Sequence, residues 1–208
     1  MSLNLKQNVK CPKCSQMSEV TVWNSITVKD SEDLKHDLLT GKVNMFRCSY
    51  SALMPTPMLY HDEDKRLMIS FSPCDDVVLK SQLFDNVQKS SKESGELDKL
   101  EGYNLRFVTD YNELLEKILI FDNDMNDKTM EVIKLMVLSQ DLEKAEQRVC
   151  RFGKCQDEVI EFMIYDTIEN QTYTSKVPKE TYDTIHKQLL ESGMKPYSFG
   201  WEMVDASY

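Results

Sequence analysis

The stretch that decides the fold of the first third is Cys11-Pro12-Lys13-Cys14, which pairs with Cys48-Ser49-Tyr50-Ser51 further along the 208-residue chain. A Cys-x-x-Cys turn brings two thiolates close enough to bind one metal ion, and two such turns from separate hairpins complete a tetrahedral zinc site. The first turn is intact, but Ser51 stands where the fourth thiolate belongs. A serine hydroxyl keeps its proton near neutral pH and is a poor zinc ligand. The sequence therefore predicts a zinc-ribbon-like module with a degenerate site of three thiols: Cys11, Cys14 and Cys48.

Strand and helix patterns extend outward from these turns. Residues 19–28 carry β-branched side chains at alternate positions, which is typical of a strand. Asp30 begins a short helix that Gly41 ends, with Leu34 and Leu38 on its buried side. The pattern then predicts two strands and a helix, at residues 43–47, 67–72 and 77–87.

A segment rich in Ser, Lys and Glu, with two glycines, follows at residues 88–104 and predicts an exposed linker. Beyond it we expect a strand at 105–108 and two helices, one from Asp110 and one at 129–142. Gly153 suggests a turn between Cys150 and Cys155. The chain then predicts strands at 159–168 and 171–177, a helix from Pro178 and a returning strand at 199–204.

These elements predict an α+β protein in four parts. They are a zinc-ribbon-like β module with one inserted helix at 1–87, the linker at 88–104, a helical hairpin region at 105–148, and a small antiparallel sheet with a helix at 149–208.

The charge is acidic and unevenly placed. The net charge is −10, made of about +1 over residues 1–70 and about −11 over residues 71–208. Phosphate backbones repel such a surface, so nucleic acid is a disfavoured partner. No apolar run approaches the about 18 residues of a membrane span, and the first residues have no apolar signal region. We therefore expect a cytoplasmic protein, away from the membrane, with reduced thiols.

Residues 5–150, roughly, resemble the CpXC domain proteins of bacteria and archaea, a family defined by two Cys-Pro-x-Cys motifs. The shared segments are Cys11–Cys14, Val22-Trp23-Asn24-Ser25, Leu38-Leu39-Thr40-Gly41, Met45-Phe46-Arg47-Cys48, Pro57-Met58-Leu59-Tyr60-His61-Asp62, Arg66-Leu67-Met68-Ile69, Leu105-Arg106-Phe107-Val108 and Asn112–Ile118.

The resemblance implies a ribbon-type metal module and no established activity. This chain departs from it at the second motif, where Ser49 and Ser51 replace Pro and Cys, and at Ser15, where such ribbons often have Gly. If a metal binds, it is expected to be zinc on Cys11, Cys14 and Cys48, with His61 as a candidate fourth ligand. The alternative is a ribbon-like turn that is held by packing and has free thiols. With one thiolate missing, we predict less than one tightly bound zinc per chain.

Other candidate chemistry is sparse. Residues 122–127 resemble the start of a calcium loop, but the loop lacks its central Gly and the closing bidentate Glu. Cys74, Cys150 and Cys155 have no redox spacing. No nucleophile, phosphate-loop or metalloprotease motif occurs. The pattern favours a non-catalytic module that binds a protein partner. The alternatives are a nucleic-acid-binding ribbon, and a hydrolase around His61 and its acidic neighbours.

Overall fold

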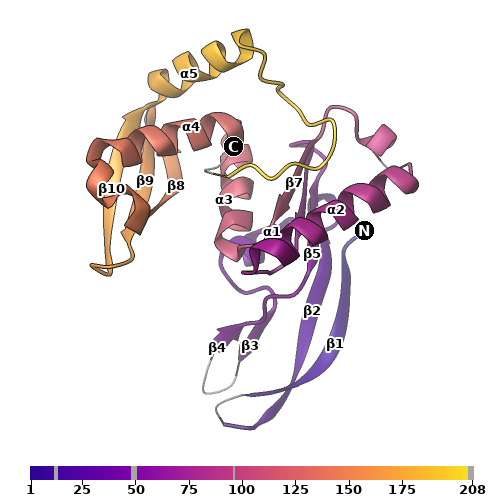
Figure 1. Ribbon diagram of the computed structural model, residues 1–208. Helices are drawn as coiled ribbons and strands as arrows, with labels where there is room; N and C mark the ends of the chain where they lie inside the picture. Colours follow the sequence, from indigo (N-terminus) through magenta and orange to yellow (C-terminus); the bar gives the residue numbers. More distant parts are fainter. Residues whose placement is uncertain (12–13, 48–50, 96, 206–208) are drawn as a thin grey trace. The chain divides into compact units, whose positions relative to one another are not determined.

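The fold is α+β, as predicted. The computed structural model describes residues 1–11, 14–47, 51–95 and 97–205. The chain forms two compact units, one of residues 1–115 with 197–202 and one of residues 116–196 with 203–208. Figure 1 shows the elements of both. No helix among the described residues is both long and apolar enough to cross a membrane.

A five-stranded sheet forms the centre of the first unit, in the order β1-β2-β5-β6-β7. β1 and β2 pair antiparallel, as do β5 and β6, while β2 with β5 and β6 with β7 are parallel. The five strands are β1 Leu3–Lys10, β2 Met17–Thr27, β5 Met58–Asp62, β6 Leu67–Phe71 and β7 Asn104–Val108. The first hairpin of the expected ribbon is therefore part of a larger mixed sheet, and β1 is a strand that the sequence pattern did not predict.

A second hairpin, β3 (Met45–Arg47) with β4 (Ser51–Leu53), packs on the far end of β2. Its Phe46 shares a buried cluster with Cys11, Val20 and Val22. Those two valines face the same side of β2, as the alternation predicted. Figure 1 shows β3 and β4 beside the outer half of β1 and β2.

Helix α1 spans Glu32–Leu39 and buries Leu34 and Leu38, as predicted. Its N-cap is Ser31 rather than Asp30, because the Ser31 hydroxyl accepts from the Leu34 N–H. Gly41 follows in the left-handed region, with a φ of 66°.

Helix α2 (Val77–Glu93) is longer than predicted and occupies the start of segment 88–104. A 3-10 helix, Leu97–Leu100, follows, so this segment is largely structured. Two hydrogen bonds fix the end of α2. The Trp201 indole donates to Ser91 Oγ at 2.8 Å, and Gln88 Nε2 donates to the Trp201 carbonyl at 2.6 Å. Those partners lie 110 or more residues away in sequence, so local composition could not reveal them.

The predicted strand 199–204 is wrong, because only an isolated bridge from Glu202 to Arg106 forms there. The Phe107 N–H donates to the Glu202 carbonyl, and the Glu202 N–H donates to the Leu105 carbonyl. The segment thus covers the edge of β7, which explains why every residue of β7 is buried.

The second unit packs helices on a three-stranded antiparallel sheet of order β10-β9-β8. The helix α3 (Tyr111–Asp122) crosses the division between the units. Gly153 does not make a turn; it lies at a bulge inside β8. The other elements are α4 Asp127–Leu138, a 3-10 segment Ser139–Gln147, β8 Arg148–Gln156, β9 Val159–Asp166, β10 Gln171–Pro178 and α5 Lys179–Glu191.

A buried ionic cluster, which we call the α3–α4 cluster, joins these helices. Lys117 lies 3.2 Å from Asp127 and 3.3 Å from Glu131. Lys134 lies 2.9 Å from Glu131 and 3.2 Å from Glu116. Charged side chains buried in this way require partners of opposite charge, because an unpaired buried charge costs several kcal/mol. The cluster therefore fixes the helix pair in one register.

Candidate functional site

Two hydrogen bonds join the ends of the Cys11–Cys14 turn, which we call the knuckle. The Cys14 N–H donates to Cys11 Sγ at 3.4 Å, and the Ser15 N–H donates to the Cys11 carbonyl at 3.0 Å. Ser15 has a φ of 59°, in the left-handed region that suits the Gly often found there.

The two thiols of this turn differ in exposure, since Cys11 is buried and Cys14 is exposed. Cys48 lies outside the described residues, so the meeting of three thiols remains a prediction. What supports it is Phe46, two residues before Cys48, which packs in the Cys11 cluster. Ser51 begins β4 opposite Arg47 and is exposed. Within the ranges that the structure describes, no group of three metal-ligating side chains occurs. The thiol chemistry of Cys11 and Cys14 fits zinc, and Cys48 is the third donor that the sequence predicts.

His61 does not belong to the knuckle. It pairs with Thr27 of β2, whereas Cys11 follows the pair of Lys10 with Met17. Thr27 and Met17 are ten residues apart on one strand, and a strand rises about 3.3 Å per residue, which separates His61 from Cys11 by roughly 30 Å. The candidate fourth ligand of the sequence pattern therefore lies too far away to share an ion with Cys11.

The surroundings of His61 are structural. Its Nε2 lies 3.3 Å from the Tyr103 hydroxyl, and burial lowers the pKa of the imidazole. The neighbouring Asp62 is buried and forms an ion pair with Lys35 at 3.0 Å. Burial acts to raise the pKa of Asp62, but hydrogen bonds from Lys35, the Lys65 N–H and Tyr60 outweigh it and lower that pKa. Asp62 thus anchors its loop.

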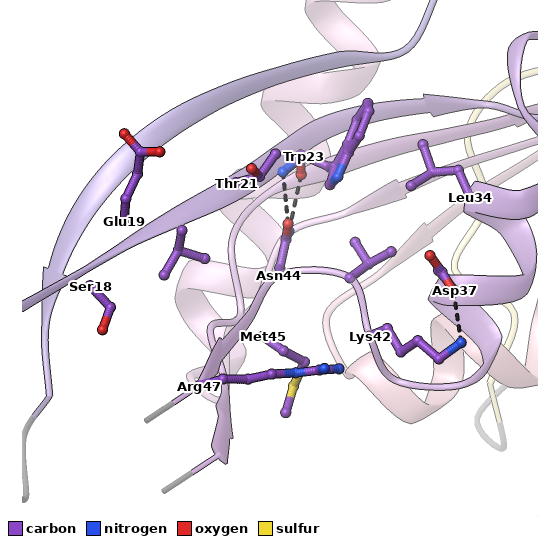
Figure 2. A pocket seen from close by; sticks show the side chains of 12 residues that line it. Ser18, Glu19, Thr21, Trp23, Leu34, Asp37, Lys42, Asn44, Met45 and Arg47 are labelled. Carbon is purple, nitrogen blue, oxygen red and sulfur yellow. Dashed lines mark hydrogen bonds and ion pairs between the residues drawn. The ribbon is translucent and has the colours of Figure 1, made fainter. Parts of the chain in front are cut away.

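A pocket of about 310 Å³ lies between β2, α1 and β3, and we call it the β2 pocket. Figure 2 shows its side chains from close by. Its lining mixes an apolar floor with a charged rim. The residues that line it are Ser18, Glu19, Val20, Thr21, Trp23, Leu34, Asp37, Lys42, Val43, Asn44, Met45 and Arg47.

Asn44 closes one end of this pocket, because its side-chain amide bonds to the Trp23 backbone as a residue of a paired strand would. Its Oδ1 accepts from the Trp23 N–H at 2.7 Å, and its Nδ2 donates to the Trp23 carbonyl at 3.0 Å (Figure 2). The same Nδ2 donates to Thr56 Oγ1 at 2.8 Å, which holds the amide in place. Asn44 adopts a φ of 55°, a conformation that Asn tolerates better than most residues.

The hydrogen bonds of Trp23 reveal how the rest of β2 is oriented. Because the N–H and C=O of Trp23 point to Asn44, they point away from β1. Backbone groups alternate sides along a strand, and the pairing with β1 is regular from Trp23 back to Met17. The N–H and C=O of Thr21 and Glu19 therefore also point away from β1. We call these four groups the open edge of β2.

Nothing in the described parts of the chain pairs with the open edge. Strand β5 joins β2 only from Ser25 to Thr27, and no backbone hydrogen bond to Glu19 or Thr21 lies on that side among the described residues. Both residues are exposed. The β2 pocket therefore lies along a stretch of strand whose outward hydrogen-bonding groups have no backbone partner among the described residues.

A family model described as CpXC protein matches residues 9–134, more than half of the 208-residue chain. The chain belongs to the CpXC family. Comparison with curated proteins gave no match, and comparison with solved structures gave none either. In this CpXC protein, the matched region holds the knuckle, the β2 pocket and the open edge.

The remaining candidates of the sequence have structural positions in this CpXC protein. Asn126 of the calcium-like segment caps α4, because its Oδ1 accepts from the Lys128 and Thr129 N–H groups. Asp127 joins the α3–α4 cluster. Cys150 is buried, and burial raises the pKa of its thiol to about 12. These residues therefore stabilise the fold.

The sequence pattern missed Asn44 and the open edge in this CpXC protein. The alternation in residues 19–28 indicated a strand but could not say which of its two edges lacks a partner. The one available signal was Asn44 itself, since Asn is enriched at turns in the left-handed region.

Proposed function

We propose that this CpXC protein is a non-catalytic interaction module that binds an extended segment of a protein partner along the open edge of β2. The observation that carries this proposal is the outward direction of the Thr21 and Glu19 backbone groups beside the β2 pocket. Unpaired strand edges template the addition of another strand, in which main-chain hydrogen bonds give affinity and adjoining pockets give specificity.

The two ends of the open edge define its length. Asn44 occupies the strand position beside Trp23, and β5 takes over from Ser25. A partner strand can therefore bond Glu19 and Thr21, and then must end or turn at Asn44. This limits the bound segment to a few residues and prevents unlimited sheet growth.

The β2 pocket supplies the side-chain selectivity. Leu34 and Val43 are buried at its floor, and Trp23 is half-buried, so an apolar side chain of the partner can pack there. At the rim, Asp37 and Lys42 neutralise each other at 2.9 Å. Arg47 is exposed and can meet an acidic side chain of the partner. The proposed partner segment is therefore extended, with an apolar anchor and an acidic residue.

Zinc has a structural role in this proposal. Held by Cys11, Cys14 and Cys48, an ion would tie the turn after β1 to the turn after β3, and both hairpins border the β2 pocket. Its binding would restrict the movement of one pocket wall against the other. The thiols bind and position, and they take no part in a reaction.

A displayed library of random peptides tests the proposal. Wild-type protein should select extended peptides, and Thr21→Pro, which removes one N–H of the open edge, should lose them while keeping its fold. N-methylation of the selected peptide should weaken binding at alternate positions, because every second N–H of an added strand points to β2. Thr21→Ala is the matched control and should still bind. Selected peptides that bind Thr21→Pro as well as wild type would exclude the open edge as the site.

A further inference from the structure

A second pocket, of about 410 Å³, lies in the first unit and is separate from the β2 pocket. We call it the Phe199 pocket. It combines an apolar base, two aromatic rings and two carboxylates. The residues that line it are Leu97, Asp98, Leu100, Glu101, Gly102, Leu105, Tyr197, Ser198 and Phe199.

Buried hydrogen bonds fix the aromatic wall of this pocket. Arg106 is fully buried, and its Nη1 donates to Ser198 Oγ at 2.5 Å and to Glu202 Oε2 at 2.8 Å. The Ser198 N–H donates to the Tyr103 carbonyl at 2.9 Å. Trp201 is buried against α2. Phe199 therefore lies between Ser198 and Trp201, which are both held by buried hydrogen bonds, so its backbone position is fixed.

Phe199 is nevertheless 73% exposed, which is costly for a large apolar side chain held in a fixed position. The Tyr197 ring lies beside it, with centroids 5.4 Å apart and planes at 56°. The two rings are in contact with each other and both line the pocket, so they offer aromatic surface on which a cation can stack.

The charges that line the pocket are all negative. Asp98 and Glu101 belong to its lining, and neither forms an ion pair within the part of the chain that the structure describes. Two basic residues lie close to the pocket but do not line it. Lys99 is the sequence neighbour of Asp98, and Arg66 is close in space. Arg66 approaches the turn at Gly102, where its Nη1 would lie 3.2 Å from an added Cβ. The pocket thus offers two carboxylates beside two rings.

We propose that the Phe199 pocket binds an arginine side chain from a basic segment of a protein partner. A guanidinium is planar, so it stacks on aromatic faces and donates to carboxylates at the same time. A neutral apolar group would pack on the two rings but would leave the carboxylates of Asp98 and Glu101 without a partner. The net charge of about −11 over residues 71–208 favours a basic partner at longer range.

The test titrates the full chain with acetyl-Gly-Arg-Gly-amide and follows the backbone NMR signals of Gly102 and Phe199. Concentrations reach about 10 mM, the range in which a single side-chain contact is measurable. The citrulline peptide has the same shape without the charge, and it should bind at least about tenfold more weakly. The lysine peptide should also bind more weakly. No shift with the arginine peptide, or equal affinity for either control peptide, overturns the proposal.

Two variants and their matched controls locate the binding. Phe199→Ala and the double variant Asp98→Asn with Glu101→Gln should each weaken the arginine peptide at least about fivefold. Leu142→Ala, at a position that is 74% exposed, and the double variant Glu143→Gln with Glu146→Gln should leave the affinity unchanged. The second control removes the same net charge, so equal loss in both doubles would mean a non-local charge effect and would refute the pocket. Thr21→Pro should not alter this binding, which separates the result from the test of the open edge.

Discussion

Proline substitution at two neighbouring positions of β2 distinguishes a strand edge that is open from one that is paired. Thr21→Pro removes an N–H that points away from β1, whereas Val22→Pro removes one that points toward Leu5 of β1. We expect Thr21→Pro to fold almost normally and Val22→Pro to be strongly destabilised. The two sites are adjacent on the same strand, so only the direction of the N–H and the burial of the side chain differ.

The magnitudes follow from what each change removes. Thr21→Pro loses no backbone hydrogen bond to any residue that the structure describes, and the exposed Thr21 side chain packs little. Its cost is therefore the restriction of φ by the proline ring, about 1 kcal/mol. Val22→Pro loses a ladder hydrogen bond and disturbs a side chain that is 1% exposed in the cluster with Cys11 and Phe46. Together these cost about 3 kcal/mol or more. We therefore expect the two free energies of unfolding to differ by about 2 kcal/mol or more.

Urea unfolding followed by tryptophan fluorescence measures both values, with Thr21→Ala and Val22→Ala as controls for the lost side chains. The proline effect is the difference between each proline variant and its alanine control. If Thr21→Pro loses as much stability as Val22→Pro after this correction, the Thr21 N–H is bonded in the fold. The open edge would then not exist.

Four further predictions concern the thiols and the buried charges. Purified protein should hold less than one zinc per chain by elemental analysis after exhaustive dialysis, and one firmly held zinc would contradict this. Ser51→Cys should raise zinc affinity in a competition titration, because a fourth thiolate completes the tetrahedral set; unchanged affinity would place residue 51 away from the ion. Burial acts to raise the pKa of Glu116, but Lys134, Arg151 and the Phe152 N–H outweigh it and lower that pKa. The stability from Glu116 is thus present above its ordinary pKa of 4.5 and lost as pH falls through the lower folded value. As the pH falls below 4.5, the free energy of unfolding should decline more steeply in wild type than in Glu116→Gln. Parallel curves for the two proteins would show that Glu116 is not the titrating group. The buried Cys150 thiol, with a pKa raised to about 12, should resist iodoacetamide at neutral pH until urea unfolds the chain. Labelling of Cys150 at the same rate in native and unfolded protein, read by peptide mass mapping, would contradict its burial.

Local patterns in the sequence predicted the elements that depend on local interactions. The spacing of Leu34 and Leu38 indicated the buried side of α1, and the alternation through Val20 and Val22 indicated the buried side of β2. Both follow from the repeat of side-chain directions, which needs no knowledge of partners. The CpXC resemblance also came from short segments and is confirmed by the match to residues 9–134.

Features that depend on distant partners could not be predicted in this way. Strand β1 is almost wholly exposed, so it carries no hydrophobic alternation, and its pairing with β2 alone makes it a strand. Segment 199–204 appeared to be a strand, but only Glu202 bridges to β7. The charges Lys117, Asp127 and Glu131 would ordinarily face solvent, yet they neutralise one another inside the second unit.

The residues of the candidate site also separate into those that local spacing indicates and those that depend on distant partners. Cys11 and Cys14 were selected from their spacing, and in the structure the Cys14 N–H donates to Cys11 Sγ. His61 was selected from its acidic neighbours in sequence, but the register of β2 with β5 places it far from the knuckle. The open edge depends on the lack of a neighbouring strand beside Glu19 and Thr21 among the described residues, and a single sequence contains no signal for that.

Backbone amide exchange along β2, with and without a peptide selected from the displayed library, tests the central claim most directly. In the free protein we predict slow exchange at Val20 and Val22, whose N–H groups point to β1, and fast exchange at Glu19 and Thr21. The bound peptide should slow amide exchange at Glu19 and Thr21 specifically. Slow exchange at Thr21 in the free protein, or fast exchange at both residues in the complex, would contradict the account.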